Sequence, residues 1–252
     1  MKSIKSVFTI IIISLAIIFS SCKKNDNTSP DSSGGGGSTQ TTYNAVFLSR
    51  KQAMITNTSV VSSGNFSTAF ISTSALANNS PMVGTLVTIG DVSLNGTTFQ
   101  KNAYSVSNYY ADSTSTVFNT PHNWIVSGSS AVNSFTYSNT NPYPVYTGYT
   151  AIADSFTIAN NITIPLINYS GSDEIETYFV TSNNPVTKTS TQNISGSPGV
   201  LSFTSVDLST IGVNPNVTLV ITFYKNNLQT INGNSVNFRT GYTLFKSNIK
   251  FK

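Results

Sequence analysis

Apolar residues in this chain recur at every second position, and no segment has the three-to-four-residue spacing of an amphipathic helix. The clearest case is residues 217–224, where all four odd-numbered residues are apolar and would share one side of an extended strand. The composition agrees, because 39 Ser, 34 Thr and 29 Asn favour strands and turns. With only 22 charged residues, helical bundles, coiled coils and most disordered chains are excluded. We therefore predict an all-β protein.

Two Asn-Gly pairs lie between strand-like runs, at Asn95-Gly96 and Asn232-Gly233. This pair is the favoured sequence of a two-residue type I′ turn, so we predict a β-hairpin at each position. Pro165 interrupts another alternating run and has no amide hydrogen to donate, so its strand is expected at the edge of a sheet.

The strand-like runs fall into two groups of about the size of an immunoglobulin-like sandwich. The first group comprises residues 46–49, 66–73, 85–94, 117–118, 124–126 and 135–137, and the second comprises residues 154–170, 174–181, 201–208, 217–224 and 235–251. Residues 139–149 lie between them, with two prolines and a glycine. We predict two immunoglobulin-like β-sandwich units, residues 43–146 and 147–252, joined by a stiff linker. A long loop within one larger sandwich is the competing interpretation.

The first 21 residues have the features of a signal peptide. Lys2 and Lys5 form a positive start, and residues 7–19 form an apolar stretch broken only by Thr9 and Ser14. Thirteen residues are too few to span a bilayer, which needs roughly 20 apolar residues, so a transmembrane anchor is an alternative only if the segment stays uncleaved.

The only cysteine, Cys22, follows directly after Phe19-Ser20-Ser21. This pattern resembles a bacterial lipobox, with Phe19 where leucine is most common. The resemblance implies cleavage between Ser21 and Cys22, a diacylglycerol on the Cys22 thiol and an acyl chain on the new amine. Two or more acyl chains hold a protein on a membrane almost permanently. The alternative is an ordinary secretory leader that happens to end at a cysteine.

Residues 22–42 form a predicted tether after this cysteine. Residues 32–38 are only Ser and Gly, and a flexible coil of 20 residues reaches about 25 Å. The Ser-Cys-Lys-Lys start with a Gly-rich tether resembles outer-membrane lipoproteins of Bacteroidota, which implies an outer-membrane, lipid-anchored protein at the cell surface. With no other cysteine, the exported domains cannot form a disulfide within one chain.

Without the leader, the chain has 11 basic and 9 acidic residues, and the basic ones are not clustered. Nucleic acid is therefore excluded as a partner. Lys246, Lys250 and Lys252 are spaced as solvated positions on an edge strand.

The globular part is also similar to a class of two-part Bacteroidota lipoproteins. The similarity lies in the hairpin of residues 90–96 and the Trp-x-Val-x-Gly of residues 124–128 in the first unit. In the second unit it lies in residues 203–208, the strand from Val217 and the final Phe-rich strand after Asn232-Gly233. The resemblance implies the two-unit fold and no particular activity.

Residues able to carry catalysis are few. His122 is the only imidazole, so a Ser-His-Asp triad would need it, and we interpret it as a loop histidine in a turn that enters a strand. Asp173, Glu174 and Glu176 are close together, but Glu174 and Glu176 project from the same side of a strand and are expected to face solvent. A weak calcium site at Asp173 is an alternative. We assign no catalytic residue, no metal site and no cofactor.

Aromatic residues in turn-rich segments give one indication of ligand binding. Sugars are bound by aromatic faces beside amide side chains, which are abundant here. The candidate platform comprises Tyr109, Tyr110, His122, Trp124, Tyr143 and Tyr146, with Tyr149 beside it. The alternative is that these rings pack in the core, which is the more common fate of a lone Trp at the start of a strand.

These observations predict a non-enzymatic, lipid-anchored envelope protein whose β-sandwich modules bind or adhere, with glycans as the favoured ligand. Its partners would be the membrane and a glycan or an envelope protein. A structural or accessory subunit of an outer-membrane assembly, with no small ligand, is the alternative.

Overall fold

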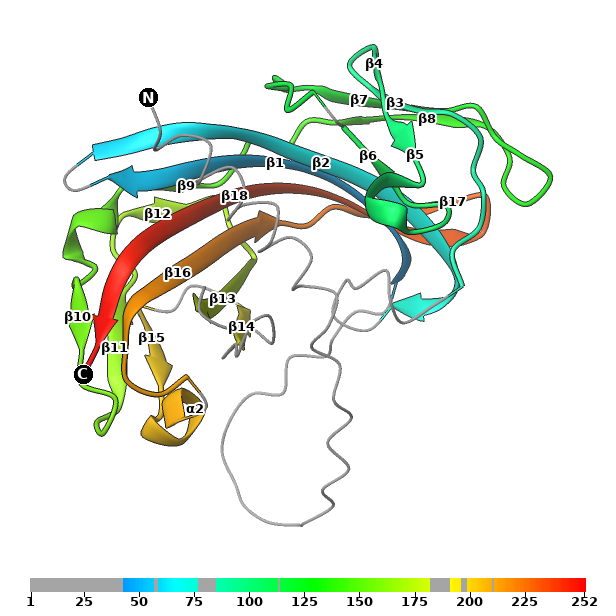
Figure 1. Ribbon diagram of the computed structural model, residues 1–252. Helices are drawn as coiled ribbons and strands as arrows, with labels where there is room; N and C mark the ends of the chain where they lie inside the picture. Colours follow the sequence, from blue (N-terminus) through cyan, green and yellow to red (C-terminus); the bar gives the residue numbers. More distant parts are fainter. Residues whose placement is uncertain are drawn as a thin grey trace.

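The computed structural model describes residues 43–56, 59–76, 85–112, 114–181, 191–195, 199–209 and 211–252. The predicted signal peptide, the tether and the lipid-attachment site at Cys22, with its cleavage position after Ser21, lie outside the described residues. The described part is all-β, as predicted, and several sheets are stacked in layers (Figure 1).

The main sheet of the described residues contains ten strands. They are β1 (Tyr43–Thr56), β2 (Ser59–Leu76), β5 (Gln100–Lys101), β6 (Tyr110–Ala111), β10 (Ser155–Phe156), β13 (Glu174–Thr181), β14 (Thr191–Ser195), β16 (Asn214–Lys225), β17 (Leu228–Ile231) and β18 (Asn234–Phe251). Their order is β14-β13-β16-β18-β1-β2-β6-β5, and β10 and β17 also pair with β18. The long strands β1, β2, β16 and β18 form an arch across the molecule (Figure 1).

Smaller sheets cover parts of this arch. One contains β3 (Val92–Leu94), β4 (Thr97–Thr98), β7 (His122–Val126) and β8 (Phe135–Asn139). Two others pair β11 (Ile162–Pro165) with β15 (Val200–Phe203), and β9 (Val145–Tyr146) with β12 (Tyr169–Ser170). The short helical segments are η2 (Ala103–Ser105), η3 (Gly148–Ala151) and α2 (Ser205–Ser209).

The first and last long strands lie side by side. β1 pairs with β18 in parallel over eleven residues, from Ala45 opposite Val236 to Ile55 opposite Lys246. On its other side, β1 pairs with β2 in an antiparallel hairpin. β1 and β18 belong to different predicted units, so one hydrogen-bonded sheet runs through residues of both. The immunoglobulin-like assignment of each unit stays a prediction.

One face of the main sheet, which we call the first face, carries two separate apolar cores. In the first core, Phe47 of β1 packs against Phe238 of β18 and, edge to face, against Trp124 of β7. In the second core, Phe179 of β13 packs against Phe203 of β15 and Phe251 of β18. The β3-β4-β7-β8 sheet therefore covers one end of the arch, and β11, β15 and α2 cover the other.

Several local predictions are confirmed. Residues 217–224 lie within β16, a central strand between β13 and β18, and the side chains of its odd-numbered residues are buried in the second core. Both Asn-Gly pairs form two-residue hairpin turns, with positive φ at both residues of each. Pro165 lies in β11, which pairs only with β15 among the described strands and is therefore an edge, as expected.

Other strand predictions are wrong because apolar residues reach a core without forming a strand. Phe118 is buried in the first core from an irregular segment, so the predicted strand at 117–118 is absent. Within residues 85–94, the β-pairing is limited to strand β3 and to an isolated bridge between Leu86 and Ser72. After β15, the chain turns into α2, and Leu208 enters the second core from this helical turn.

The prediction for Lys246 is also wrong. β18 is central rather than an edge strand, and the Lys246 side chain is buried. Its Nζ forms an ion pair with Asp154 at 2.7 Å and donates to the main-chain oxygen of Ile152. The ion pair holds the pKa of Asp154 below its ordinary value, and it explains how a lysine is tolerated inside the sheet.

Trp124 tests the packing of the first core. Trp124→Ala should lower the free energy of unfolding by about 3–5 kcal/mol, because it removes a fully buried indole between Phe47 and Phe99. The control is Ile125→Thr on the exposed side of the same strand. This substitution should change the free energy of unfolding by less than about 0.5 kcal/mol. Urea denaturation of both variants measures this difference. Equal stabilities would contradict the packing described here.

Candidate functional site

The two cores are separated by a polar interruption in the middle of β1. Phe47 on one side and Ala53 on the other belong to the first and second cores, respectively. Between them, Ser49 and Lys51 point to the same face, because side chains two apart share a face of a strand. On β18, Thr240 and Tyr242 are the Cα partners of Ser49 and Lys51. The first face is therefore polar where the two cores would otherwise meet.

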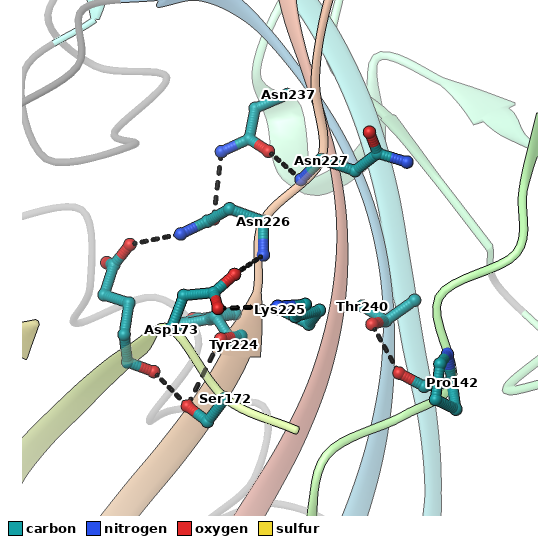
Figure 2. A network of polar contacts seen from close by, with 10 residues as sticks. Pro142, Ser172, Asp173, Tyr224, Lys225, Asn226, Asn227, Asn237 and Thr240 are labelled. Atoms are coloured by element: carbon teal, nitrogen blue, oxygen red, sulfur yellow. Dashed lines mark hydrogen bonds and ion pairs between the residues drawn. The ribbon is translucent and has the colours of Figure 1, made fainter. Parts of the chain in front are cut away.

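The chain segment 139–149, predicted as a linker, lies across this polar interruption. The Tyr143 hydroxyl is 2.6 Å from Ser49 Oγ, and the Thr240 hydroxyl donates to the Pro142 main-chain oxygen at 2.9 Å (Figure 2). Asn139 Nδ2 donates to the main-chain oxygen of Phe238 at 3.2 Å. The hydroxyls of the sheet are thus satisfied by the segment that covers them, and this segment is fixed to the main sheet.

A groove opens beside this segment, with a volume of about 520 Å³. Its walls come from both predicted units: Lys51, Val60, Phe118, Asn119, Thr120, residues 142–147, Tyr149 and Tyr242. Tyr143, Tyr149 and Tyr242 are half-buried, so each presents part of its ring to the groove, whereas Tyr146 is buried. The volume lies in the range typical of small-molecule sites.

The hydroxyls of Tyr143, Tyr146 and Tyr242 stay protonated at neutral pH. Burial raises the pKa of Tyr143 to about 12, against the opposing effect of its hydrogen bond with Ser49, and burial raises the pKa of Tyr146 to about 12. The pKa of Tyr242 is also raised, first by burial and then by the neighbouring Tyr149. These side chains therefore offer neutral hydroxyls and apolar ring faces to a ligand.

Lys51 is the only charged residue among those lining the groove. Its Nζ lies 4.5 Å from the centre of the Tyr143 ring, in a cation–π arrangement. Asn119 and Thr120, which also line the groove, are exposed. The groove thus combines aromatic surfaces, an amide, hydroxyls and one ammonium group.

His122 packs against Tyr143. It is the first residue of β7 and completely buried, not a loop histidine as predicted, and its ring stands edge-on to Tyr143 with 4.9 Å between the ring centres. Burial lowers the pKa of His122 to about 4; the main chain of Asn139 opposes this change, and the charge of Lys51 adds to it. No carboxylate of the described residues pairs with either ring nitrogen, so His122 lacks the acidic partner of a catalytic triad there.

Four of the six predicted platform residues do not line the groove. Tyr109, Tyr110, His122 and Trp124 are all buried. Tyr109 stacks on Phe70, and the hydroxyl of Tyr110 accepts a hydrogen bond from the Ile89 amide. The remaining two predicted residues, Tyr143 and Tyr146, do line the groove together with Tyr149.

Lys51 and Tyr242 were not predicted as site residues. Tyr242 lies inside a long strand and looks like an ordinary strand residue. A signal was nevertheless present in the sequence, because Ser49 and Lys51 interrupt the apolar positions of β1 on a single face. Such a polar interruption within an otherwise buried strand face indicates a place where a core ends.

The predicted carboxylate cluster lies at the junction of β13 and β16 and serves structural pairing. Asp173 forms an ion pair with Lys225 at 2.7 Å and accepts a hydrogen bond from the Asn226 amide at 3.0 Å (Figure 2). Glu174 forms an ion pair with Arg239 at 2.8 Å and accepts from Asn226 Nδ2. Both oxygens of Asp173 are thus occupied by protein donors, which disfavours the calcium site considered for it.

Glu176 does not face open solvent, contrary to the prediction. It is half-buried and accepts a hydrogen bond from the Tyr224 hydroxyl at 3.0 Å. Burial raises its pKa, and the like charge of Glu174 adds a smaller increase, as expected for carboxylates on one side of a strand. On the same face, the buried guanidinium of Arg50 lies 4.7 Å from the centre of the Phe66 ring.

No family model, curated protein or solved structure matches this chain. In the part of the chain that the structure describes, no helix is long and apolar enough to cross a membrane. Over the same residues, no three histidine, cysteine or acidic side chains are grouped as potential metal ligands.

His122 makes the stability of the fold depend on pH. Its pKa is about 4 in the folded protein and close to 6.5 when unfolded, so between these values the unfolded state binds the additional proton. Stability should therefore fall as the pH is lowered from 7 to 4, by about 3 kcal/mol from this residue. His122→Phe keeps a ring against Tyr143 but does not titrate. Its free energy of unfolding should therefore fall by about 3 kcal/mol less than that of the unmodified protein between pH 7 and pH 4.

The measurement is urea denaturation of both proteins at pH 7, 5.5 and 4. Carboxylates titrate in both, so the difference between the two proteins isolates His122. Parallel pH profiles would show that the histidine is not held neutral by burial.

Proposed function

We propose that this protein is a lipid-anchored protein of the bacterial envelope that binds glycans in the tyrosine-lined groove and acts by binding, not by catalysis. The observation that carries the proposal is the presence of three half-buried tyrosines, Tyr143, Tyr149 and Tyr242, around one groove. Their positions are fixed by the main sheet and by the segment across it.

The chemistry of the groove suits a sugar ring. A pyranose has an apolar C–H face, which stacks on an aromatic ring, and a rim of hydroxyls, which need donors and acceptors. The tyrosine rings supply the stacking surface for the C–H face, and polar side chains are needed for the hydroxyls. Asn119 and Thr120 supply these polar groups, and their exposed side chains are free of hydrogen bonds to the described residues. An open groove, in contrast to an enclosed cavity, also accommodates an internal segment of a longer glycan.

The position of the groove supports two sandwich-like units. Each half of the main sheet packs against its own smaller sheet over its own core, and the groove lies between these halves. We propose that they are two immunoglobulin-like units that follow a signal peptide and a flexible tether. The proposal rests on this layering and on the sequence pattern.

The lipid anchor rests on the sequence alone. Cys22 follows a 13-residue apolar stretch and precedes a Ser/Gly tether, which is the arrangement of a lipoprotein signal. Anchoring at the outer membrane, on the cell surface, would hold the start of β1 within about 25 Å of the bilayer. The alternative function, a structural or accessory subunit of an outer-membrane assembly, requires no ligand in the groove.

The groove is tested with a glycan array and the full chain purified in detergent. Tyr143→Ala and Tyr149→Ala should each weaken binding about tenfold, because each removes a stacking surface. Tyr104→Ala is the matched control: Tyr104 is 46% exposed and packs near Phe66, away from the groove, so binding should not change. If the unmodified protein binds no glycan, the accessory-subunit alternative replaces this proposal.

Cys22 tests the anchor. Cells grown with radiolabelled palmitate should incorporate label into the protein, and Cys22→Ala should abolish the label and release the protein from the membrane fraction. Cys22→Ser is the conservative control and should behave in the same way, because a thiol is required for attachment. A Cys22→Ala protein that remains membrane-bound would disprove anchoring through this residue.

A further inference from the structure

We infer that the groove selects anionic sugars, and that Lys51 is the residue that recognises their charge. This inference rests on the proposed function, because it names the substrate class of the same groove. It starts from the charge of the lining: Lys51 is cationic, and no carboxylate is among the lining residues. A neutral sugar would leave this charge without a partner.

Lys51 has no counter-ion among the described residues, and it is the lining residue of the groove that carries a charge. Lys225, Arg239 and Lys246 each form an ion pair with a carboxylate at 2.7 or 2.8 Å. Lys51 makes no ion pair and no hydrogen bond with the described residues. Its ammonium group is partly desolvated against the Tyr143 ring and keeps its three N–H donors for a ligand.

The position of Lys51 is determined by the sheet. Its strand pairs with β2 on one side and β18 on the other, with Asn65 and Tyr242 as its Cα partners. The Tyr143 ring fixes the end of the side chain, and Tyr143 is itself held by Ser49 and His122. The charge is thus placed at a defined distance from an aromatic surface.

This arrangement fits a sugar that carries a charge on its ring substituent. In a uronic acid, the carboxylate projects from the edge of the pyranose ring. Stacking of the ring on a tyrosine of the groove would bring that carboxylate toward the ammonium group. A sulfate ester on a sugar hydroxyl offers the same chemistry, an anionic oxygen group at the edge of a stacked ring, so the shared feature is an anionic sugar.

The experiment compares an acidic oligosaccharide with its uncharged methyl ester and with a sulfated oligomer. Isothermal titration calorimetry of the full chain in detergent would use tetragalacturonic acid, its fully methyl-esterified form and a sulfated galactose oligomer. The acid should bind at least tenfold more tightly than the ester, and its affinity should fall as NaCl is raised. Tight binding of the sulfated oligomer as well would extend the specificity to anionic sugars in general, whereas preference for the acid restricts it to carboxylates.

The variants identify the residue. Lys51→Met keeps the apolar stem and removes the charge, so the acid and the ester should bind equally, whereas Lys51→Arg should keep the preference for the acid. Lys101→Met is the control, because Lys101 is exposed, lies outside the groove and donates to Thr88 at 2.9 Å; it should leave the preference unchanged. Circular dichroism would verify that each variant is folded.

Two failures are distinguishable. Equal binding of acid and ester by the unmodified protein, or an unchanged preference in Lys51→Met, would overturn the inference and leave glycan binding intact. No binding of any of these ligands, together with an empty glycan array, would remove the proposed function and the inference with it.

Discussion

The parallel pairing of β1 with β18 is the constraint on which the rest of the structure depends. At about 3.3 Å per residue, eleven paired residues extend over roughly 35 Å. The strands available to cover this length are short: β7 and β8 have five residues each, and β11 and β15 have four. One covering sheet cannot bury the whole face, so two sheets cover its ends and a space remains between them. The residues of β1 and β18 at this level are accordingly polar or half-buried.

The opposite face of the main sheet is polar at the same level. Arg50 and Gln52 of β1 lie there between two apolar clusters, and the Thr222 and Thr243 hydroxyls bond to each other at 2.8 Å across β16 and β18. Glu174 and Arg239 compensate one another nearby. Buried polar groups are stabilised by pairing, so the Thr222–Thr243 hydrogen bond and the Glu174–Arg239 ion pair allow polar side chains to be buried at this level of the sheet. In Figure 2, Asp173, directly before β13, is joined to Lys225 at the end of β16 and to the following Asn226.

Local features of the fold could be predicted from the sequence, and features of long range could not. The Asn-Gly turns and the strand at 217–224 depend on neighbouring residues, so their patterns are sufficient. β1 was predicted as only residues 46–49, because Arg50, Lys51 and Gln52 end the apolar alternation, although the strand continues through them. Because the apolar alternation of β1 stops there, Lys51 was not predicted as part of a site. Trp124 and Tyr110 have aromatic rings suited to a ligand platform, but whether such a ring faces inward depends on which sheet covers it. Tyr143 and Tyr149, in contrast, lie in the segment between the two cores and are half-buried, whereas the neighbouring Tyr146 is buried in the second core.

The groove derives its character from groups that are fixed before a ligand arrives. Ser49 and His122 hold Tyr143, so its ring loses little conformational freedom on binding. The low pKa of His122 matters for the same reason: a charged imidazole against Tyr143 would repel the ammonium of Lys51 and displace it from the ring. Burial keeps the histidine neutral, so no second charge repels the Lys51 ammonium group from the Tyr143 ring. The buried His122 thus helps to keep the Lys51 ammonium group in place beside the groove.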